Sequence, residues 1–100
     1  MIKIIDGKKY DTDTAECVAT NEEMPEDNLR YVVESLYRKT NGEYFLFGQG
    51  GPKSRYVRWL SSNSFTSGSE IIPLTEEEAK SWAENLPGET YISIFGDLEE

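Results

Sequence analysis

The dipeptide Asn41-Gly42 constrains the fold of this chain more than any other feature of its sequence. It separates two runs rich in Val, Leu, Tyr and Phe, and Asn-Gly between such runs is the strongest short-range signal for a β-hairpin. We therefore expect a hairpin over residues 29–49. If Asn41-Gly42 is a two-residue turn, Leu36 pairs with Phe47.

Side-chain alternation along these two strands then predicts one core face and one unusually aromatic face. The expected core face carries Val32, Leu36, Phe45 and Phe47. The other face carries Tyr31, Val33, Tyr37, Lys39, Tyr44 and Leu46. Because so many rings are unusual on a solvated surface, Tyr37, Lys39 and Tyr44 are candidate contacts for a partner.

Two further β elements are expected around this hairpin. Asp6-Gly7 between short apolar runs predicts a hairpin over residues 2–10. Residues 69–74 are predicted to form a short strand, and Pro73 places it at an edge or a strand end because proline has no backbone N–H to donate.

Two helices are expected, at residues 13–20 and 76–86. In the first, Asp13 and Glu16 have the spacing of a capping box. In the second, Thr75 and Glu78 have the same spacing, and an apolar stripe that includes Trp82 follows. Residues 90–95 fit either a short helix or a strand.

Together these elements predict an α+β fold in a small single domain spanning residues 1–100. A twisted antiparallel β-sheet is built from the hairpins at 2–10 and 29–49 and the strand at 69–74, and the two helices pack on one of its faces. The segment 50–68 has no clear role, and we expect Trp59 and Leu60 to anchor it.

Composition limits the function classes. The 100 residues include no His and one Cys, which removes the commonest general base and every multi-cysteine zinc site. No apolar stretch approaches the length of a membrane span. We therefore expect a soluble, cytoplasmic, non-enzymatic protein that needs no cofactor and no metal.

Charge is unevenly distributed within a formal net charge of −9. Residues 70–100 hold nine acidic side chains and one basic one, whereas residues 28–58 hold six basic and two acidic. The exposed carboxylates of Glu76, Glu77 and Glu84 would imitate a run of phosphates and occupy a basic surface of a protein partner. We expect such a partner rather than nucleic acid. The sequence is also compatible with a homodimer.

The basic middle supports an alternative function. Within residues 29–58, cationic side chains alternate with rings, which is the composition of a small nucleic-acid-binding module. The net negative charge opposes this function, because it weakens long-range attraction to a polyanion. Both functions therefore stay open at the level of sequence.

Several blocks of the sequence resemble a family of small acidic uncharacterised proteins of bacterial mobile elements, namely phages, plasmids and conjugative elements. The blocks are Ile4-Ile5-Asp6-Gly7-Lys8-Lys9-Tyr10, Leu36-Tyr37-Arg38-Lys39, Gly48-Gln49-Gly50-Gly51-Pro52 and Ile71-Ile72-Pro73-Leu74-Thr75-Glu76. The resemblance implies a setting rather than a chemistry. Small acidic proteins of such elements are often inhibitors of host defence, including anti-CRISPR proteins that block a nucleic-acid-binding effector.

Overall fold

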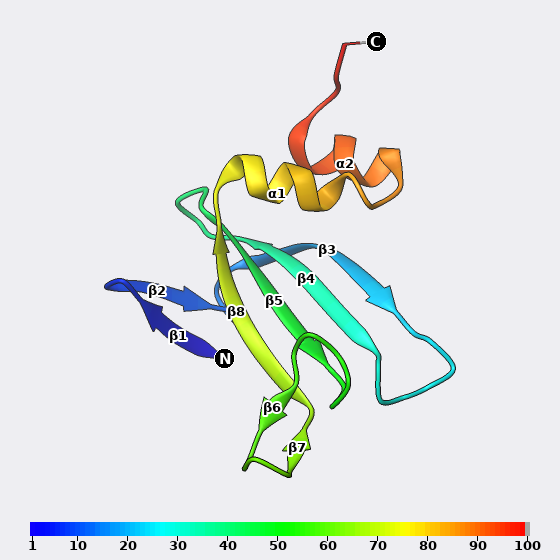
Figure 1. Cartoon of the computed structure of the whole chain (residues 1–100). Helices are drawn as coiled ribbons and strands as arrows, with labels where there is room; N and C mark the ends of the chain where they lie inside the picture. Colours follow the sequence, from blue (N-terminus) through cyan, green and yellow to red (C-terminus); the bar gives the residue numbers. More distant parts are fainter. Residues whose placement is uncertain (100) are drawn as a thin grey trace.

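The computed structural model describes residues 1–99 and has an α+β fold (Figure 1). The strands are β1 (Ile2–Ile5), β2 (Lys8–Asp11), β3 (Glu16–Glu23), β4 (Val32–Arg38), β5 (Tyr44–Gly50), β6 (Arg58–Trp59), β7 (Phe65–Thr66) and β8 (Gly68–Leu74). The helices are α1 (Glu76–Ala83) and α2 (Gly88–Phe95). Neither helix has the length and apolar character needed to cross a membrane, within the residues described.

The main sheet has four antiparallel strands in the order β3-β4-β5-β8. The predicted hairpin around residues 29–49 forms its two central strands, and β8 confirms the strand predicted at 69–74. β8 lies at the edge of the sheet, as Pro73 requires. The predicted hairpin at 2–10 also forms, but as a separate two-stranded sheet rather than as part of the main one.

The predicted two-residue turn at Asn41-Gly42 is wrong by one residue. Leu36 pairs with Leu46 instead of Phe47, and the loop contains three residues, because the backbone N–H of Lys39 donates to the carbonyl of Glu43 at 2.8 Å. Gly42 closes this loop with a φ of 90°, the left-handed conformation that such a loop needs.

This register changes which side chains share a face. Leu36, Tyr44 and Leu46 belong to one core cluster, together with Ala79 of α1. Phe45 lies on the opposite face, in a second cluster with Tyr10 and Ile71. The predicted division into a core face and a solvated aromatic face is therefore wrong, because both faces of the central hairpin are covered.

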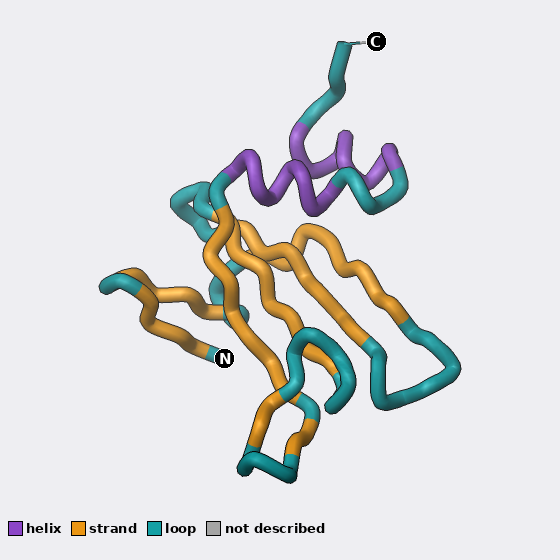
Figure 2. The backbone as a smooth tube through the Cα atoms, viewed as in Figure 1, coloured by secondary structure: helices purple, strands orange, loops and turns teal. Residues whose placement is uncertain are grey.

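The molecule accordingly has three layers (Figure 2). The two helices pack over one face of the main sheet, while the β1–β2 hairpin packs against the other through Ile5 and Tyr10. Leu36 is fully buried between the main sheet and the helices. Phe45 is fully buried between the main sheet and the β1–β2 hairpin. The central sheet is thus held from both sides by apolar packing.

The predicted helix at residues 13–20 does not form. Residues 12–14 make a turn in which the backbone N–H of Asp13 donates to the Asp11 carboxylate at 2.9 Å, and β3 then extends from Glu16 to Glu23. The predicted helix over residues 13–20 would have only a little more than two turns. Pairing with β4 over the length of β3 supplies more hydrogen bonds than so short a helix can, so tertiary structure overrides the local preference.

The two helices that do form lie at the C-terminal end. The predicted capping box of α1 is present, since the Glu78 N–H donates to Thr75 Oγ1 at 3.1 Å and the Thr75 N–H donates to Glu78 Oε1 at 2.9 Å. The segment 90–95, which the sequence left open, lies within α2. Gly96 follows it at a φ of 96°.

Residues 51–67 connect β5 to β8 and include the small β6–β7 ladder. Tyr56 anchors this segment, because its ring is buried directly over Gly48, where any Cβ would collide with it. The prediction that Trp59 and Leu60 anchor the segment is wrong. Both side chains are exposed.

Candidate functional site

The helices form an acidic helical layer, which we define as α1, Glu84 and α2. Glu76, Glu77 and Glu84 are all exposed in it, as the sequence predicted. Lys80 is the one basic residue between positions 70 and 99, and it pairs with Glu76 at 3.7 Å. Most of the negative charge of this layer is therefore presented to solvent without a neighbouring cation.

The helix dipole explains only part of this charge. Glu76 and Glu77 lie in the first turn of α1, where carboxylates favour the positive end of the dipole. Glu84 is the C-cap residue, at the negative end, where a carboxylate is unfavourable. The position of Glu84 thus has no explanation in helix stability.

Packing beneath α1 holds the layer in place. Ala79 and Ala83 are fully buried against the sheet, and their small side chains let the helix approach it closely. Trp82 is half-buried beside them, consistent with its predicted place in the apolar stripe. The carboxylates on the outer side of α1 therefore sit on a rigid support.

The other three predicted contact residues do not form one surface with the glutamates. Tyr44 is buried under α2, with its ring 5.6 Å from that of Phe95. Tyr37 lies on the opposite face, stacked on Phe45 at 5.1 Å. Lys39 is mostly buried, with Nζ 3.8 Å from the centroid of the Tyr10 ring.

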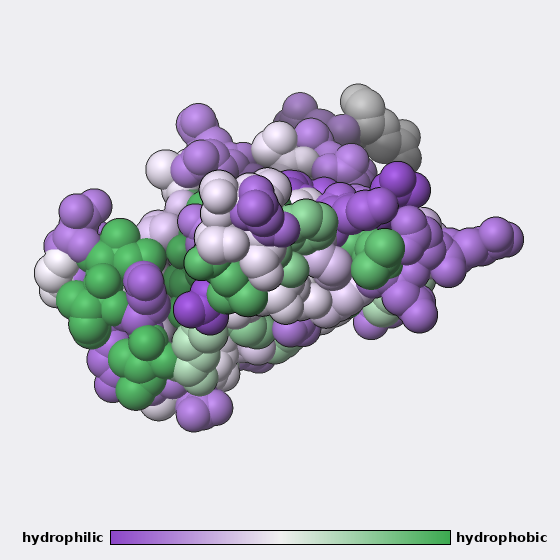
Figure 3. Space-filling model, turned by 60° about the horizontal axis from the view of Figure 1, so that its bottom comes forward, coloured by the Kyte–Doolittle hydropathy of each residue, from purple (hydrophilic) through white to green (hydrophobic). Residues whose placement is uncertain are grey.

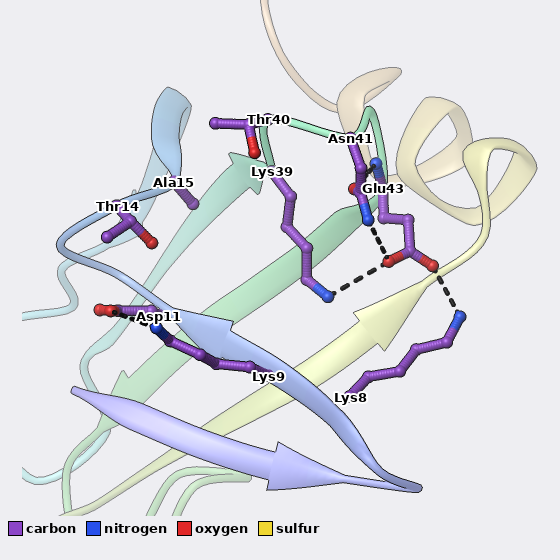
Figure 4. Close-up of a pocket in the computed structure, with 9 residues that line it drawn as sticks. All are labelled: Lys8, Lys9, Asp11, Thr14, Ala15, Lys39, Thr40, Asn41 and Glu43. Atoms are coloured by element: carbon purple, nitrogen blue, oxygen red, sulfur yellow. Dashed lines mark hydrogen bonds and ion pairs between the residues drawn. The ribbon is translucent and has the colours of Figure 1, made fainter.

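Lys39 lines a cleft between the β1–β2 hairpin and the turn at residues 39–43 (Figure 4). The cleft has a volume of about 520 Å³. Glu43 lines one end of it and accepts hydrogen bonds from Lys8 at 2.7 Å, from Asn41 at 2.9 Å and from Lys39 at 3.2 Å. The charged groups of this cleft are thus largely engaged with one another.

A second hollow of about 500 Å³ adjoins this cleft and shares Lys8, Asn41 and Glu43 with it. Of the six residues predicted as contacts, Tyr44 and Glu76 are the two that line this second hollow.

The ion pairs around Glu43 shift its titration. Hydrogen bonds from Lys8, Asn41 and Lys39 lower the pKa of the Glu43 carboxyl from 4.5 to about 2. The same contact raises the pKa of Lys8. Glu43 is therefore ionised throughout the physiological range, and it ties the β1–β2 hairpin to the main sheet.

This arrangement predicts a pH dependence of stability. Because the folded-state pKa of Glu43 is depressed, its contribution is complete above the unfolded value of 4.5 and is lost as pH falls toward about 2. Urea unfolding of wild type and Glu43→Gln between pH 7 and pH 3 measures it, and the difference between the two proteins should shrink as pH falls. Glu77→Gln serves as the control, and a wild-type-to-Glu43→Gln difference that stays constant with pH would contradict the assignment.

A buried polar network lies between α1, β4 and the 51–67 segment. Glu34 is only 7% exposed, and its carboxylate accepts hydrogen bonds from the Tyr56 hydroxyl and from Trp82 Nε1, the latter at 3.1 Å. Arg55 adds an ion pair with Glu34 at 3.0 Å and a longer one with Glu23 at 3.6 Å. Glu34 thus joins three separate elements of the chain.

These contacts determine the ionisation of the network. Burial alone would raise the pKa of Glu34, but the hydrogen bonds from Tyr56, Trp82 and Arg55 outweigh it and lower the pKa. Burial and the Glu34 carboxylate raise the pKa of Tyr56, so its hydroxyl stays a donor. This network was not predicted from the sequence. The sequence feature that could have indicated it is Glu34, which lies between Val32 and Leu36 on the strand face predicted to be buried.

Comparison with protein-family models, with curated proteins and with solved structures yields no match for this chain. The resemblance to small acidic proteins of mobile elements therefore stays a prediction. Within residues 1–99, no group of three or more Cys, Asp or Glu side chains is arranged to hold a metal ion.

Proposed function

We propose that this protein is a non-enzymatic inhibitor that binds a protein partner through its acidic helical layer. The observation that carries the proposal is that Glu76, Glu77 and Glu84 are all exposed on α1 or at its C-cap. The helix is packed on the sheet through buried alanines, and Lys80 is the one basic residue of α1 and α2. A partner with a basic groove has complementary charge. The layer would occupy that groove in place of a nucleic-acid backbone.

The physics of such a contact favours fast and specific association. Carboxylates on a fixed scaffold attract a basic surface before contact, which raises the association rate by about 10- to 1000-fold. A rigid helix also loses little conformational freedom on binding. Glu84 fits this role well, because it opposes the helix dipole and gains a favourable cation only from a partner.

The biological setting of the proposal comes from the sequence resemblance. Proteins of phages, plasmids and conjugative elements often inhibit host defence, and a CRISPR effector is a nucleic-acid-binding protein with a strongly basic channel. An anti-CRISPR activity is therefore the specific form of inhibition that we propose to test first.

The geometry supports the acidic helical layer better than it supports a nucleic-acid-binding surface formed by residues 29–58. Tyr37 and Tyr44 lie on opposite faces of the sheet, and Tyr44 and Tyr56 are buried. Those rings are not available together for stacking on bases. The proposed contact residues are therefore the glutamates of α1 rather than the rings of the central hairpin.

Charge reversal tests the proposal. Partners retained by the immobilised protein from a bacterial lysate are identified by mass spectrometry, and their association rates are measured with the purified proteins. The variant with Glu76→Lys, Glu77→Lys and Glu84→Lys should associate at least about tenfold more slowly, with a weaker dependence on salt. It should also no longer displace nucleic acid from the partner.

Two controls accompany this experiment. The matched variant with Asp13→Lys, Glu22→Lys and Glu26→Lys changes the net charge equally, but away from the helices, and should bind nearly as wild type does. Replacement of the three helix residues by Gln separates loss of charge from the cost of lysines in the first turn. If both lysine variants lose the same fraction of the association rate, the acidic helical layer is not the binding surface.

A further inference from the structure

The segment of residues 51–67, which we name the cationic lobe, differs from the rest of the molecule in charge. Its cations are Lys53, Arg55 and Arg58, and no Asp or Glu occurs between positions 44 and 69 of a chain whose net charge is −9. Arg55 is engaged with Glu34. Within residues 1–99, neither Lys53 nor Arg58 forms an ion pair, so both are available to an anion.

The outer part of the lobe presents aromatic rings to solvent. Trp59 of β6 is 62% exposed and Phe65 of β7 is 41% exposed, and their ring centroids lie 5.0 Å apart. Leu60 beside them is 60% exposed. Figure 3 turns this end of the molecule toward the viewer and shows green apolar surface in separate areas among purple polar groups.

The lobe is pre-organised at its base. The buried Tyr56 holds it over β5, and its hydroxyl donates to Glu34. Gly68 approaches the backbone of Tyr56 so closely that a Cβ there would collide with it. The exposed rings therefore project from a fixed support, which lowers the entropic cost of binding.

Hollows flank Arg58 in two directions. One, of about 450 Å³, is lined by Tyr31, Gln49 and Arg58 among others. The other, of about 360 Å³, is lined by residues that include Arg55, Arg58 and Trp59, and also by Glu70 of β8. Arg58 thus borders both hollows, and the second hollow also reaches the ring of Trp59.

We propose that the cationic lobe binds single-stranded nucleic acid, with Trp59 and Phe65 stacking on bases and Arg58 and Lys53 contacting phosphates. Stacking rings beside cations are the usual means of binding single strands without sequence preference. A duplex hides the faces of its bases, so the exposed rings favour a single strand. This surface is separate from the acidic helical layer and does not depend on the proposed inhibition.

The acidic helices do not prevent this binding. β8 runs seven residues from the lobe to the start of α1, a distance of roughly 20 Å. Charges are screened over about 8 Å at physiological ionic strength. The lobe at the lower end of Figure 1 therefore acts on a nearby phosphate largely independently of α1 and α2 at the upper end.

Fluorescence anisotropy of 5′-fluorescein oligonucleotides tests the proposal. Twelve-residue oligothymidylate and oligouridylate should both bind saturably, and comparison of the two distinguishes DNA from RNA. A twelve-residue abasic strand keeps the phosphates without the bases and should bind at least about tenfold more weakly, because stacking is lost. Two phosphate contacts should give about a sevenfold loss of affinity between 50 and 200 mM salt.

Four variants assign the contacts. Trp59→Ala should weaken oligonucleotide binding by about tenfold or more, whereas Trp59→Phe keeps a ring and should retain most of it. Arg58→Gln should weaken binding and should reduce the slope of log affinity against log salt by the amount expected for about one phosphate contact. Lys3→Gln removes the same charge from β1 and should leave the affinity nearly unchanged. Circular dichroism and thermal unfolding check that each variant keeps its fold.

Several outcomes would overturn the proposal. Absence of saturable binding at 50 mM salt would do so, as would equal affinity for the abasic strand. If the lobe instead binds a protein, the wild-type protein would bind no oligonucleotide. Trp59→Ala and Leu60→Ala would then each weaken binding of the protein partner. Failure of the charge-reversal variant of α1 to change partner inhibition would leave these oligonucleotide results unaffected.

Discussion

Replacing Phe45 with alanine should lower the free energy of unfolding by about 3–5 kcal/mol. The side chain is fully buried in the central strand β5. Its ring makes an edge contact with Tyr10 at 5.5 Å and stacks on Tyr37 at 5.1 Å. The substitution leaves a cavity between the main sheet and the β1–β2 hairpin, which is held there mainly by side chains.

Urea unfolding followed by circular dichroism measures this effect, and Phe65→Ala is the matched control. Phe65 is 41% exposed at the tip of the lobe, so its removal should cost less than about 1 kcal/mol. If Phe45→Ala unfolds at the same urea concentration as Phe65→Ala, the β1–β2 hairpin does not pack on β5 as described.

Replacing Glu34 with alanine should have the second largest effect, a loss of at least about 2 kcal/mol. The substitution leaves the Trp82 Nε1–H and the Tyr56 hydroxyl without their acceptor, and each buried donor left unsatisfied costs about 1–3 kcal/mol. Arg55 also loses its shorter ion pair. The lobe and α1 should loosen together, because Glu34 contacts both.

Urea unfolding measures the loss, and trypsin cleavage near Lys53 and Arg58 reports on the lobe. Glu34→Gln is the matched control, because its amide oxygen still accepts one of the two hydrogen bonds, so it should lose less stability than Glu34→Ala. Equal unfolding of wild type and Glu34→Ala, with no change in cleavage, would mean that Glu34 does not join these elements.

Local signals in the sequence predicted much of the fold correctly. The Asp6-Gly7 turn, the strand at 69–74 and the capping box at Thr75 each depend on residues close together in the chain. The hairpin around Asn41 was also predicted, although the three-residue loop shifted its register. A shift of one residue moves every side chain to the other face, which is why the predicted core face was wrong.

The remaining errors concern contacts between residues distant in the chain. The helix predicted at 13–20 had a sound local signal, but pairing of β3 with β4 across an intervening loop overrides it. The anchor of the lobe is Tyr56 rather than Trp59 because the space over Gly48 appears only when β5 is in its sheet.

The candidate site was predictable to a similar extent. The exposed positions of Glu76, Glu77 and Glu84 follow from helical periodicity, and the structure has them exposed. Tyr37 and Tyr44 were separated by the register of the hairpin. The Glu34 network could not be predicted in full, because Glu34 of β4 meets its donors from the 51–67 segment and from α1 only in the folded chain.

The β1–β2 hairpin shares no strand ladder with the main sheet, and this has a consequence for how the molecule opens. Side-chain packing and the ion pair of Lys8 with Glu43 at 2.7 Å join the two sheets. The hairpin can therefore detach without breaking a hydrogen bond of β3, β4, β5 or β8. We therefore expect it to open as a separate cooperative unit, with amide protons that exchange with solvent at a lower opening free energy than those of β4 and β5.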